Sequence, residues 1–180
     1  MQFVAHSIPG LYEILPEPHH DERGSFARYY CADEFLAHGL ELPDRQAAVS
    51  RNFKRATLRG LHYIDEAQGE AKLVRCTRGA VADVAVDLRP GSATFGAHVM
   101  IELSADKLNA LFIPRGVAHG FITLSDECDV AYQFSQPYRA GIEKGLRWDD
   151  PDIAIAWPIA PQIISDRDQA LPYLNEKTQS

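Results

Sequence analysis

A cation, a glycine and an imidazole occur within four residues of one stretch, Arg59-Gly60-Leu61-His62. Branched and aromatic residues flank the histidine, which is typical of a β-strand. A neutral imidazole can remove a proton from carbon, and a guanidinium can bind phosphate through two parallel hydrogen bonds. In the alternative interpretation, both side chains are solvated or satisfied by neighbours on an ordinary strand.

Further polar residues could complete a proton-transfer site with His62. Lys72, Asp83 and Tyr132 each lie in an apolar, strand-like segment, and Asp168 lies near the end of the chain. Hydrogens on carbons beside a ketone are weakly acidic, so a base, an acid and a cation could epimerise a keto sugar without a cofactor. His62 would remove the proton, ideally with a carboxylate fixing its tautomer; Lys72 would stabilise the enolate, and Tyr132 would return a proton on the opposite face. Alternatively, Lys72 and Asp83 lie on a solvated face, Tyr132 is a core aromatic and Asp168 is a surface residue.

Two histidines also raise the question of a metal site. The stretch from Pro114 to His119 follows the Pro-x-Gly-x-x-His pattern of cupin jelly rolls, many of which bind a divalent metal. Such proteins usually have a second histidine two residues after the first, but Ile64 stands two residues after His62. A metal needs three or more well-placed ligands, so we expect no metal.

Composition narrows the class of protein. The chain has 180 residues and a formal net charge of −7, so it lacks the basic character of a nucleic-acid-binding protein. The sequence predicts neither a signal peptide nor a membrane-spanning segment. Cys31, Cys76 and Cys128 show no paired metal spacing and are interpreted as reduced thiols of a cytoplasmic protein.

The elements that would position these residues are mainly strands. Alternating or apolar segments recur between turn residues, and this regular spacing predicts a single all-β domain over residues 1–180, a sandwich or barrel. We expect strands at 2–6, 11–15, 24–31, 46–53, 56–63, 71–77, 80–88, 95–103, 108–113, 120–123 and 129–134. We expect helices at 32–38 and 166–171, a polar turn region at 16–23, a loop at 64–70, a turn at 142–145 and a frayed tail at 175–180.

The spacing of Arg59 and His62 in the stretch 59–62 does not fit a regular strand. Arg59 and His62 have opposite parity along the strand, so they would point to opposite faces. If both face one pocket, the strand must be bulged or sharply twisted between them. We expect this irregularity at Gly60.

Over nearly its whole length the chain resembles the dTDP-4-dehydrorhamnose 3,5-epimerase family. The resemblance rests on motifs in the family's order, at residues 21–26, 58–63, 72–76, 83–89, 113–121, 148–151, 155–158 and 165–168. It implies a double-stranded β-helix (cupin jelly roll) with short peripheral helices. It further implies a homodimer in which N-terminal strands cross to the partner's sheet, a nucleotide diphosphate sugar as substrate, and neither metal nor cofactor.

The resemblance also implies roles for individual residues. His62 matches the base, paired with Asp168; Tyr132 matches the proton donor, and Lys72 matches the residue near the C4 carbonyl oxygen. Residues matching those that bind the rest of the substrate are Arg23, Arg59 and His119 for the diphosphate and sugar, Phe26 and Tyr138 as aromatic groups around the nucleotide, and Gln46 and Glu143 as further nucleotide contacts.

The sequence departs from the family pattern beside the expected nucleotide site. Arg28 replaces the usual Glu, Ala48 replaces the usual Asn, and Ile64 replaces the usual Gln. One residue is also inserted between Gln46 and Arg59. Exchanging a carboxylate for a guanidinium changes what a pocket accepts, so we hypothesise that the preferred nucleotide differs from thymidine.

The leading interpretation is epimerisation at C3, C5 or both of a nucleotide-linked 4-keto-6-deoxy sugar, in deoxysugar biosynthesis for surface polysaccharide. Within the same class, the alternative is a monofunctional 3- or 5-epimerase for a sugar on another nucleotide. A metal-dependent cupin would need a third ligand. A sugar-binding module would keep Arg59 and His119 but would not need His62, Tyr132 and Asp168 together.

Overall fold

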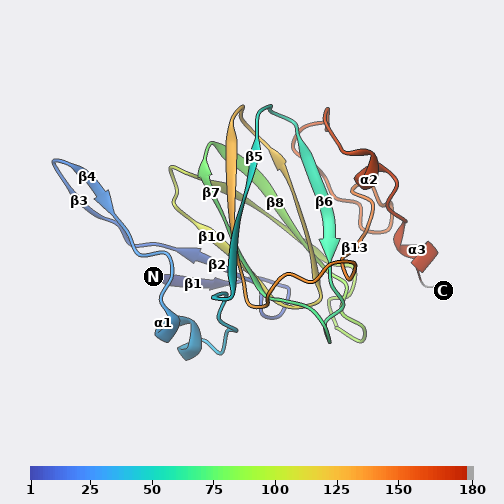
Figure 1. Ribbon diagram of the computed structural model, residues 1–180, viewed down its shortest axis with the longest axis horizontal. Coiled ribbons are helices and arrows are strands. Elements are labelled where there is room, and N and C mark those ends of the chain that lie inside the picture. The colour runs from blue at the N-terminus through green and yellow to red at the C-terminus, as the bar shows by residue number, and fades with distance from the viewer. Residues whose placement is uncertain (178–180) are drawn as a thin grey trace.

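Two antiparallel β-sheets form the body of the protein, for which the computed structural model describes residues 1–177 (Figure 1). The chain is thus mostly β-structure with three short helices in its described part. In spatial order, the six-stranded sheet contains β1 (Gln2–Ala5), β2 (Tyr12–Leu15), β10 (Ala110–Ile113), β7 (Lys72–Arg78), β12 (Cys128–Phe134) and β5 (Gln46–Asn52). The five-stranded sheet contains β13 (Lys144–Gly145), β6 (Leu58–Tyr63), β11 (Val117–Thr123), β8 (Ala80–Asp87) and β9 (His98–Ser104).

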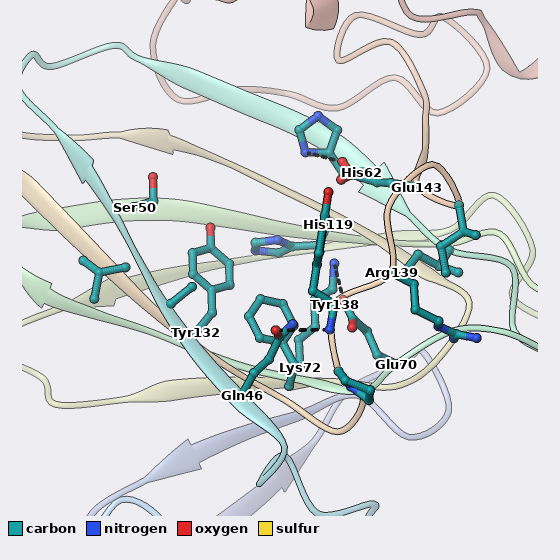
Figure 2. A pocket seen from close by; sticks show the side chains of 16 residues that line it. Gln46, Ser50, His62, Glu70, Lys72, His119, Tyr132, Tyr138, Arg139 and Glu143 are labelled. Atoms are coloured by element: carbon teal, nitrogen blue, oxygen red, sulfur yellow. Dashed lines mark hydrogen bonds and ion pairs between the residues drawn. The ribbon is translucent and has the colours of Figure 1, made fainter.

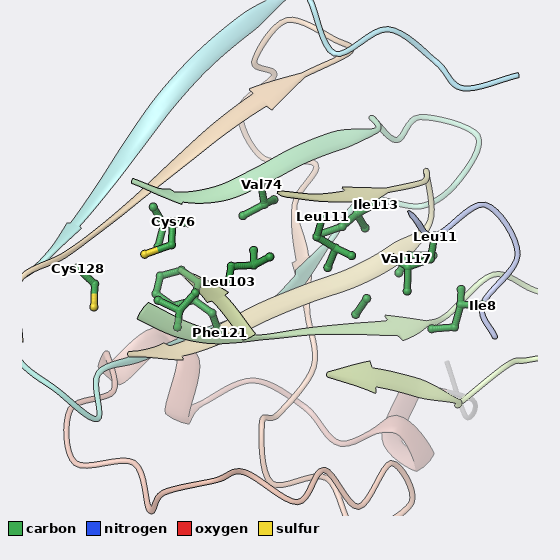
Figure 3. Close-up of a cluster of buried hydrophobic side chains, with 13 residues drawn as sticks. Ile8, Leu11, Val74, Cys76, Leu103, Leu111, Ile113, Val117, Phe121 and Cys128 are labelled. Atoms are coloured by element: carbon green, nitrogen blue, oxygen red, sulfur yellow. The ribbon is translucent and has the colours of Figure 1, made fainter. Parts of the chain in front are cut away.

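The main hydrophobic core lies between the two sheets. Its buried side chains come from both, for example Val74 and Leu111 from the larger sheet and Leu103 and Phe121 from the smaller (Figure 3). Alternate residues of each strand reach this core, as the period of two predicts. Lys72 lies on the same strand face as Val74, so its side chain is also directed toward the space between the sheets.

The outer face of the smaller sheet is covered by the C-terminal part of the chain. Val84 and Val86 of β8 contact Leu146 and Ile153 there, so β8 is buried on both faces. The Leu58 N–H also donates to the Ile163 carbonyl oxygen, at 2.9 Å. This packing places α2 (Asp166–Gln169) and α3 (Leu174–Lys177) beside β6 (Figure 1).

The structure corrects two expectations near the N-terminus. Residues 16–23 are not only a turn, because β3 (His19–Asp21) pairs with β4 (Gly24–Phe26) in a separate hairpin. The strand predicted over residues 24–31 ends at Phe26. The aromatic residues after Phe26 pack against other elements instead of continuing the strand. Tyr29 stacks on the guanidinium of Arg75 in β7 at 3.8 Å, and Tyr30 packs against Phe35 of α1 (Ala32–Ala37).

Other element boundaries shift for local reasons. β9 begins at His98 because residues 95–97 form a turn in which the Gly96 N–H donates to the Asp87 carbonyl oxygen. β11 begins at Val117, three residues earlier than predicted, and the predicted turn at 142–145 contains β13. The helix predicted at 166–171 ends at Gln169, and residues 175–177 of the expected frayed tail belong to α3; residues 178–180 lie outside the described part.

Candidate functional site

A bulge at Gly60 turns Arg59 and His62 toward the same site. The pairing between β6 and β11 shifts register here: His62 pairs with His119, whereas Arg59 pairs with Phe121. A Cβ on Gly60 would lie 2.7 Å from the Gly120 Cα, so only glycine permits the close approach of the two strands. The irregularity predicted at Gly60 is confirmed.

Asp168 fixes the imidazole of His62 through the ring nitrogen Nε2. Its Oδ1 lies 2.7 Å from His62 Nε2, and its Oδ2 accepts the Gly60 N–H at 3.1 Å. Ser165 caps α2 by accepting the Asp168 N–H at 3.1 Å, which fixes the carboxylate relative to β6. Burial alone would raise the pKa of Asp168, but the hydrogen bonds from His62 and Gly60 outweigh it and lower that pKa below its usual value. The ionised carboxylate therefore favours a proton on Nε2 and leaves Nδ1 of His62 as the free base nitrogen.

A second histidine–aspartate pair lies on the neighbouring strands. His119 Nε2 is 2.8 Å from Asp83 Oδ2, and both side chains are almost fully buried. Among the described residues, Asp83 Oδ1 has no hydrogen-bond partner. Burial raises the pKa of Asp83, and the interaction with His119 offsets this only in part. The alternative in which Asp83 lies on a solvated face is wrong.

Tyr132 faces the two histidines from the larger sheet. Its ring meets the His119 ring edge to face, with centroids 5.9 Å apart, and stacks on Phe134 at 5.8 Å. Burial raises the pKa of Tyr132 far above its usual value, the charge of Asp83 raises it further, and only Arg59 opposes the shift. The phenol is therefore protonated at neutral pH and can act as an acid.

Lys72 reaches the same space from β7. Its Nζ lies 3.8 Å from Glu70 Oε1 and 5.9 Å from the centre of the Phe134 ring. Burial lowers the pKa of Lys72, while the charges of Glu70, Glu143 and Asp83 counteract this effect. Burial raises the pKa of Glu70 in turn. The alternative of a solvated face is therefore wrong for Lys72 as well.

These groups line two adjoining cavities of about 300 Å³ each, the first of which is drawn in Figure 2. The two cavities share Ser50, His62, His119, Tyr132 and Glu143. Lys72 and Glu70 line one cavity, and Arg59 and Asp168 line the other. The arrangement places the His62 imidazole, the protonated Tyr132 phenol and the Lys72 amino group around one cavity. It can therefore remove a proton from a carbon acid, stabilise the resulting enolate and return a proton.

The residues expected to bind the nucleotide divide into two groups. Gln46, Tyr138 and Glu143 line the first cavity, and the Gln46 side-chain oxygen accepts the Tyr138 N–H at 3.2 Å. Arg23 and Phe26 do not reach it, because they lie on the β3–β4 hairpin. That hairpin extends away from both sheets (Figure 1), and Phe26 is 78% exposed.

Sequence reasoning missed several polar residues that line these cavities, among them Ser50, Glu70 and Arg167. Arg167 and Ser50 line the second cavity, and Glu70 lies beside Lys72 in the first. Two of these carried a usable signal. Arg167 directly precedes Asp168 in the matched motif, and Glu70 shares the parity of Lys72 two residues later.

Two further features bear on cofactors and membranes. Within residues 1–177, the structure contains no group of three or more His, Cys, Asp or Glu side chains placed to hold a metal ion. Over the same residues, the helices are too short and polar to cross a bilayer. Cys31, Cys76 and Cys128 are all unpaired.

Comparison with known proteins gives a consistent result. Residues 5–176 match the family model described as dTDP-4-dehydrorhamnose 3,5-epimerase. The chain is 42% identical over 178 residues to the Methanothermobacter thermautotrophicus protein named dTDP-4-dehydrorhamnose 3,5-epimerase, covering 97% of this chain and 95% of that one. It is also 41% identical over 163 residues to the Streptomyces niveus protein named dTDP-4-dehydrorhamnose 3-epimerase, covering 90% of this chain and 78% of that one.

The fold agrees with this similarity. The crystal structure of NovW, a 4-keto-6-deoxy sugar epimerase from the novobiocin gene cluster of Streptomyces spheroides, superimposes with a TM-score of 0.94 at 38% identity. The superposition covers 99% of this chain and 90% of that one. The predicted all-β jelly roll with short peripheral helices is confirmed.

Proposed function

The chain belongs to the dTDP-4-dehydrorhamnose 3,5-epimerase family, and we propose that it inverts C3 and C5 of a dTDP-linked 4-keto-6-deoxy sugar through one metal-free proton-transfer site. It is an isomerase that needs no cofactor under this proposal. The observation that carries the proposal is the position of His62, which has Asp168 behind it and Tyr132 among the groups around the same cavity.

His62 acts as the base. Asp168 holds the proton on Nε2, so the lone pair on Nδ1 can accept the proton from the sugar. Removing the hydrogen from C3 or C5 leaves an enolate whose charge collects on the C4 oxygen. A carbon acid beside a ketone is weak, so the rate depends on how strongly this oxygen is stabilised.

Lys72 supplies the positive charge at the C4 oxygen. It lines the cavity from β7, where low solvent access strengthens its interaction with a developing negative charge. Glu70, 3.8 Å away, favours the charged form of Lys72 against the effect of burial. The Glu70 carboxylate and the negative charge that develops on the C4 oxygen both favour the ammonium form of Lys72.

Tyr132 returns a proton to the face opposite His62, and so inverts the carbon. Its raised pKa keeps the phenol protonated before the reaction. The same raised pKa makes the phenolate that forms afterwards a strong base, which takes up a new proton readily. Base and acid then return to their starting states for a second inversion.

We assign substrate binding to residues around this centre. Arg59 and His119 bind the diphosphate and sugar, and Gln46, Tyr138 and Glu143 contact the nucleotide.

Arg23 and Phe26 would come from a second copy of the chain. The hairpin that carries them extends from the sheets, and β5 is an edge strand on which Val49 is exposed, with the exposed Phe53 directly after it. These features support a homodimer. We place the enzyme in the cytoplasm, in deoxysugar biosynthesis for surface polysaccharide.

A single-centre epimerase is the second candidate, because one relative is named as a 3-epimerase. The names of the curated relatives favour dTDP over another nucleotide. One feature supports the prediction of another nucleotide: Ala48, in place of the usual Asn, lines the first cavity. Arg28 lies 3.4 Å from Glu34 and is not among the residues that line either cavity.

The test is product analysis by NMR after incubation with dTDP-4-keto-6-deoxyglucose, beside thermal shifts with dTDP, UDP, GDP and CDP. Inversion at C3 and C5 with the largest shift for dTDP is expected. Inversion at C3 alone would assign the 3-epimerase activity, and a larger shift for another diphosphate would assign the nucleotide differently. No turnover, together with binding of dTDP, would indicate a binding module and contradict the proposal.

A further inference from the structure

The reactive nitrogen of His62 faces a second carboxylate. Glu143 Oε1 lies 3.5 Å from His62 Nδ1 (Figure 2), whereas Asp168 contacts the other ring nitrogen, Nε2. The side chain of Glu143 is 38% exposed, whereas that of Asp168 is 5% exposed. The imidazole therefore has a buried carboxylate at one nitrogen and a solvent-accessible carboxylate at the other.

A base that inverts two carbon centres must release the first proton before it can remove the second. After the first abstraction, His62 is an imidazolium and cannot remove a second hydrogen. Asp168 offers no exit to solvent, because it is almost fully buried and its two oxygens are bound to His62 and to the Gly60 N–H. Tyr132 lies on the opposite face of the sugar in the proposed mechanism, so the bound sugar separates it from Nδ1.

Resting on the proposed function, we propose that Glu143 is the proton exit of this site: it accepts the proton from His62 Nδ1 after each abstraction and passes it to water. In this step the Nδ1–H bond breaks and an O–H bond forms on Glu143, which then ionises to solvent. One solvent proton returns to the phenolate of Tyr132. One proton leaves and one enters, so the site recovers its initial protonation state with the sugar still bound.

The surroundings of Glu143 suit a relay. The same oxygen, Oε1, accepts a hydrogen bond from Arg167 Nη2 at 3.0 Å, so the carboxylate bridges the Arg167 guanidinium and the imidazole. Next in the chain, Lys144 pairs with Asp65 at 2.6 Å and anchors the turn. Glu143 can therefore move locally at the cavity mouth while its backbone stays in place.

The experiment compares Glu143→Gln with Asp65→Asn in deuterium oxide. The amide introduced by Glu143→Gln keeps the size of the side chain but cannot accept a proton from an imidazolium, whereas Asp65→Asn loosens the same turn without facing His62. Mass spectrometry and NMR then follow how much product carries one deuterium and how much carries two, during a single turnover of dTDP-4-keto-6-deoxyglucose. Thermal unfolding of each variant checks that it is folded.

For Glu143→Gln, we expect the second exchange to slow about tenfold or more relative to the first, so that singly labelled sugar accumulates. Added formate should restore the second exchange, because it supplies a small carboxylate at the open cavity. Asp65→Asn should keep the wild-type ratio of the two exchanges. Equal slowing of both exchanges without rescue by formate would overturn the proposal and leave Glu143 as a binding residue. Absence of any exchange in the wild-type enzyme would instead overturn the proposed function, and this inference with it.

Discussion

The two histidine–aspartate pairs use the same chemical groups in opposite surroundings. His62 and His119 face each other across β6 and β11. The side chain of His62 is 26% exposed and its partner Asp168 has a lowered pKa, whereas His119 is 6% exposed and its partner Asp83 has a raised pKa. The Nε2–Oδ distances within the two pairs, 2.7 and 2.8 Å, are nearly equal and do not distinguish them.

Burial acts to raise the pKa of both aspartates, and the environment of the second carboxylate oxygen distinguishes them. In Asp168 that oxygen accepts the Gly60 N–H, whereas in Asp83 it is buried and unpaired among the described residues. A carboxylate that is hydrogen-bonded twice remains ionised and fixes the tautomer of its imidazole, and the open nitrogen of His62 can then exchange protons with the cavity. The more deeply buried His119 is suited to hold a substrate rather than to exchange protons.

Replacing each histidine by asparagine should therefore give unequal losses. His62→Asn should reduce the rate of deuterium uptake into the sugar by about 10³-fold or more, because no other described base faces the cavity in the same position. The measurement is mass spectrometry of the sugar after incubation in deuterium oxide. If the exchange rate stayed within a factor of a few of wild type, another residue would be the base.

Asp168→Asn tests the support behind the base and should have the next largest effect. The amide can no longer fix the proton on Nε2, so we expect kcat to fall by about 10²-fold to 10³-fold with little change in KM. Steady-state kinetics would show this. A change confined to KM would mean that Asp168 only shapes the binding site.

His119→Asn should act mainly on binding. We expect KM to rise by about tenfold while kcat changes less, because His119 would contact the substrate equally in the ground state and the transition state. The same kinetic assay measures both constants. A fall in kcat as large as that of His62→Asn would abolish the distinction between the two pairs.

The smallest expected effect concerns stability in acid. The folded pKa of Asp168 is lowered, so its contribution is present above about pH 4 and is lost as the pH falls through the folded pKa. The contribution of Asp83 to stability changes with pH in the opposite direction. Because its folded pKa is raised, this contribution grows as the pH falls toward about 4. Denaturant unfolding from about pH 3 to 7 should show a shallower acid loss in Asp168→Asn and a smaller gain on mild acidification in Asp83→Asn. Parallel curves for both variants and wild type would refute this difference.

The sequence was sufficient to predict most of the strands and the bulge in β6, but not the short strands β3 and β13. Strand alternation is a local signal, and Gly60 lies between two polar residues of opposite parity, so the bulge follows from short-range geometry. The motifs matched to the family also indicated that Lys72, Tyr132 and Asp168 belong with His62, although spacing alone could not bring together residues 106 positions apart.

Features set by long-range packing escaped prediction. Glu143 was expected to contact the nucleotide, but its contact with His62 depends on the pairing of β13 with β6, which no local pattern indicated. The strand expected over residues 24–31 ends early, and Tyr29 beyond its end stacks on the guanidinium of Arg75, which belongs to β7. The burial of Asp83 likewise depends on the stacking of the two sheets rather than on its neighbours in sequence.

The central claim is that His62 removes a proton from one face of the sugar and Tyr132 returns one to the other. The most direct test is NMR of the sugar after incubation of Tyr132→Phe in deuterium oxide, which reads label and configuration at C3 and C5 together. The account predicts that deuterium still enters, with the original configuration kept, while inversion falls by about 10²-fold or more. Inversion at the wild-type rate in Tyr132→Phe would contradict the claim.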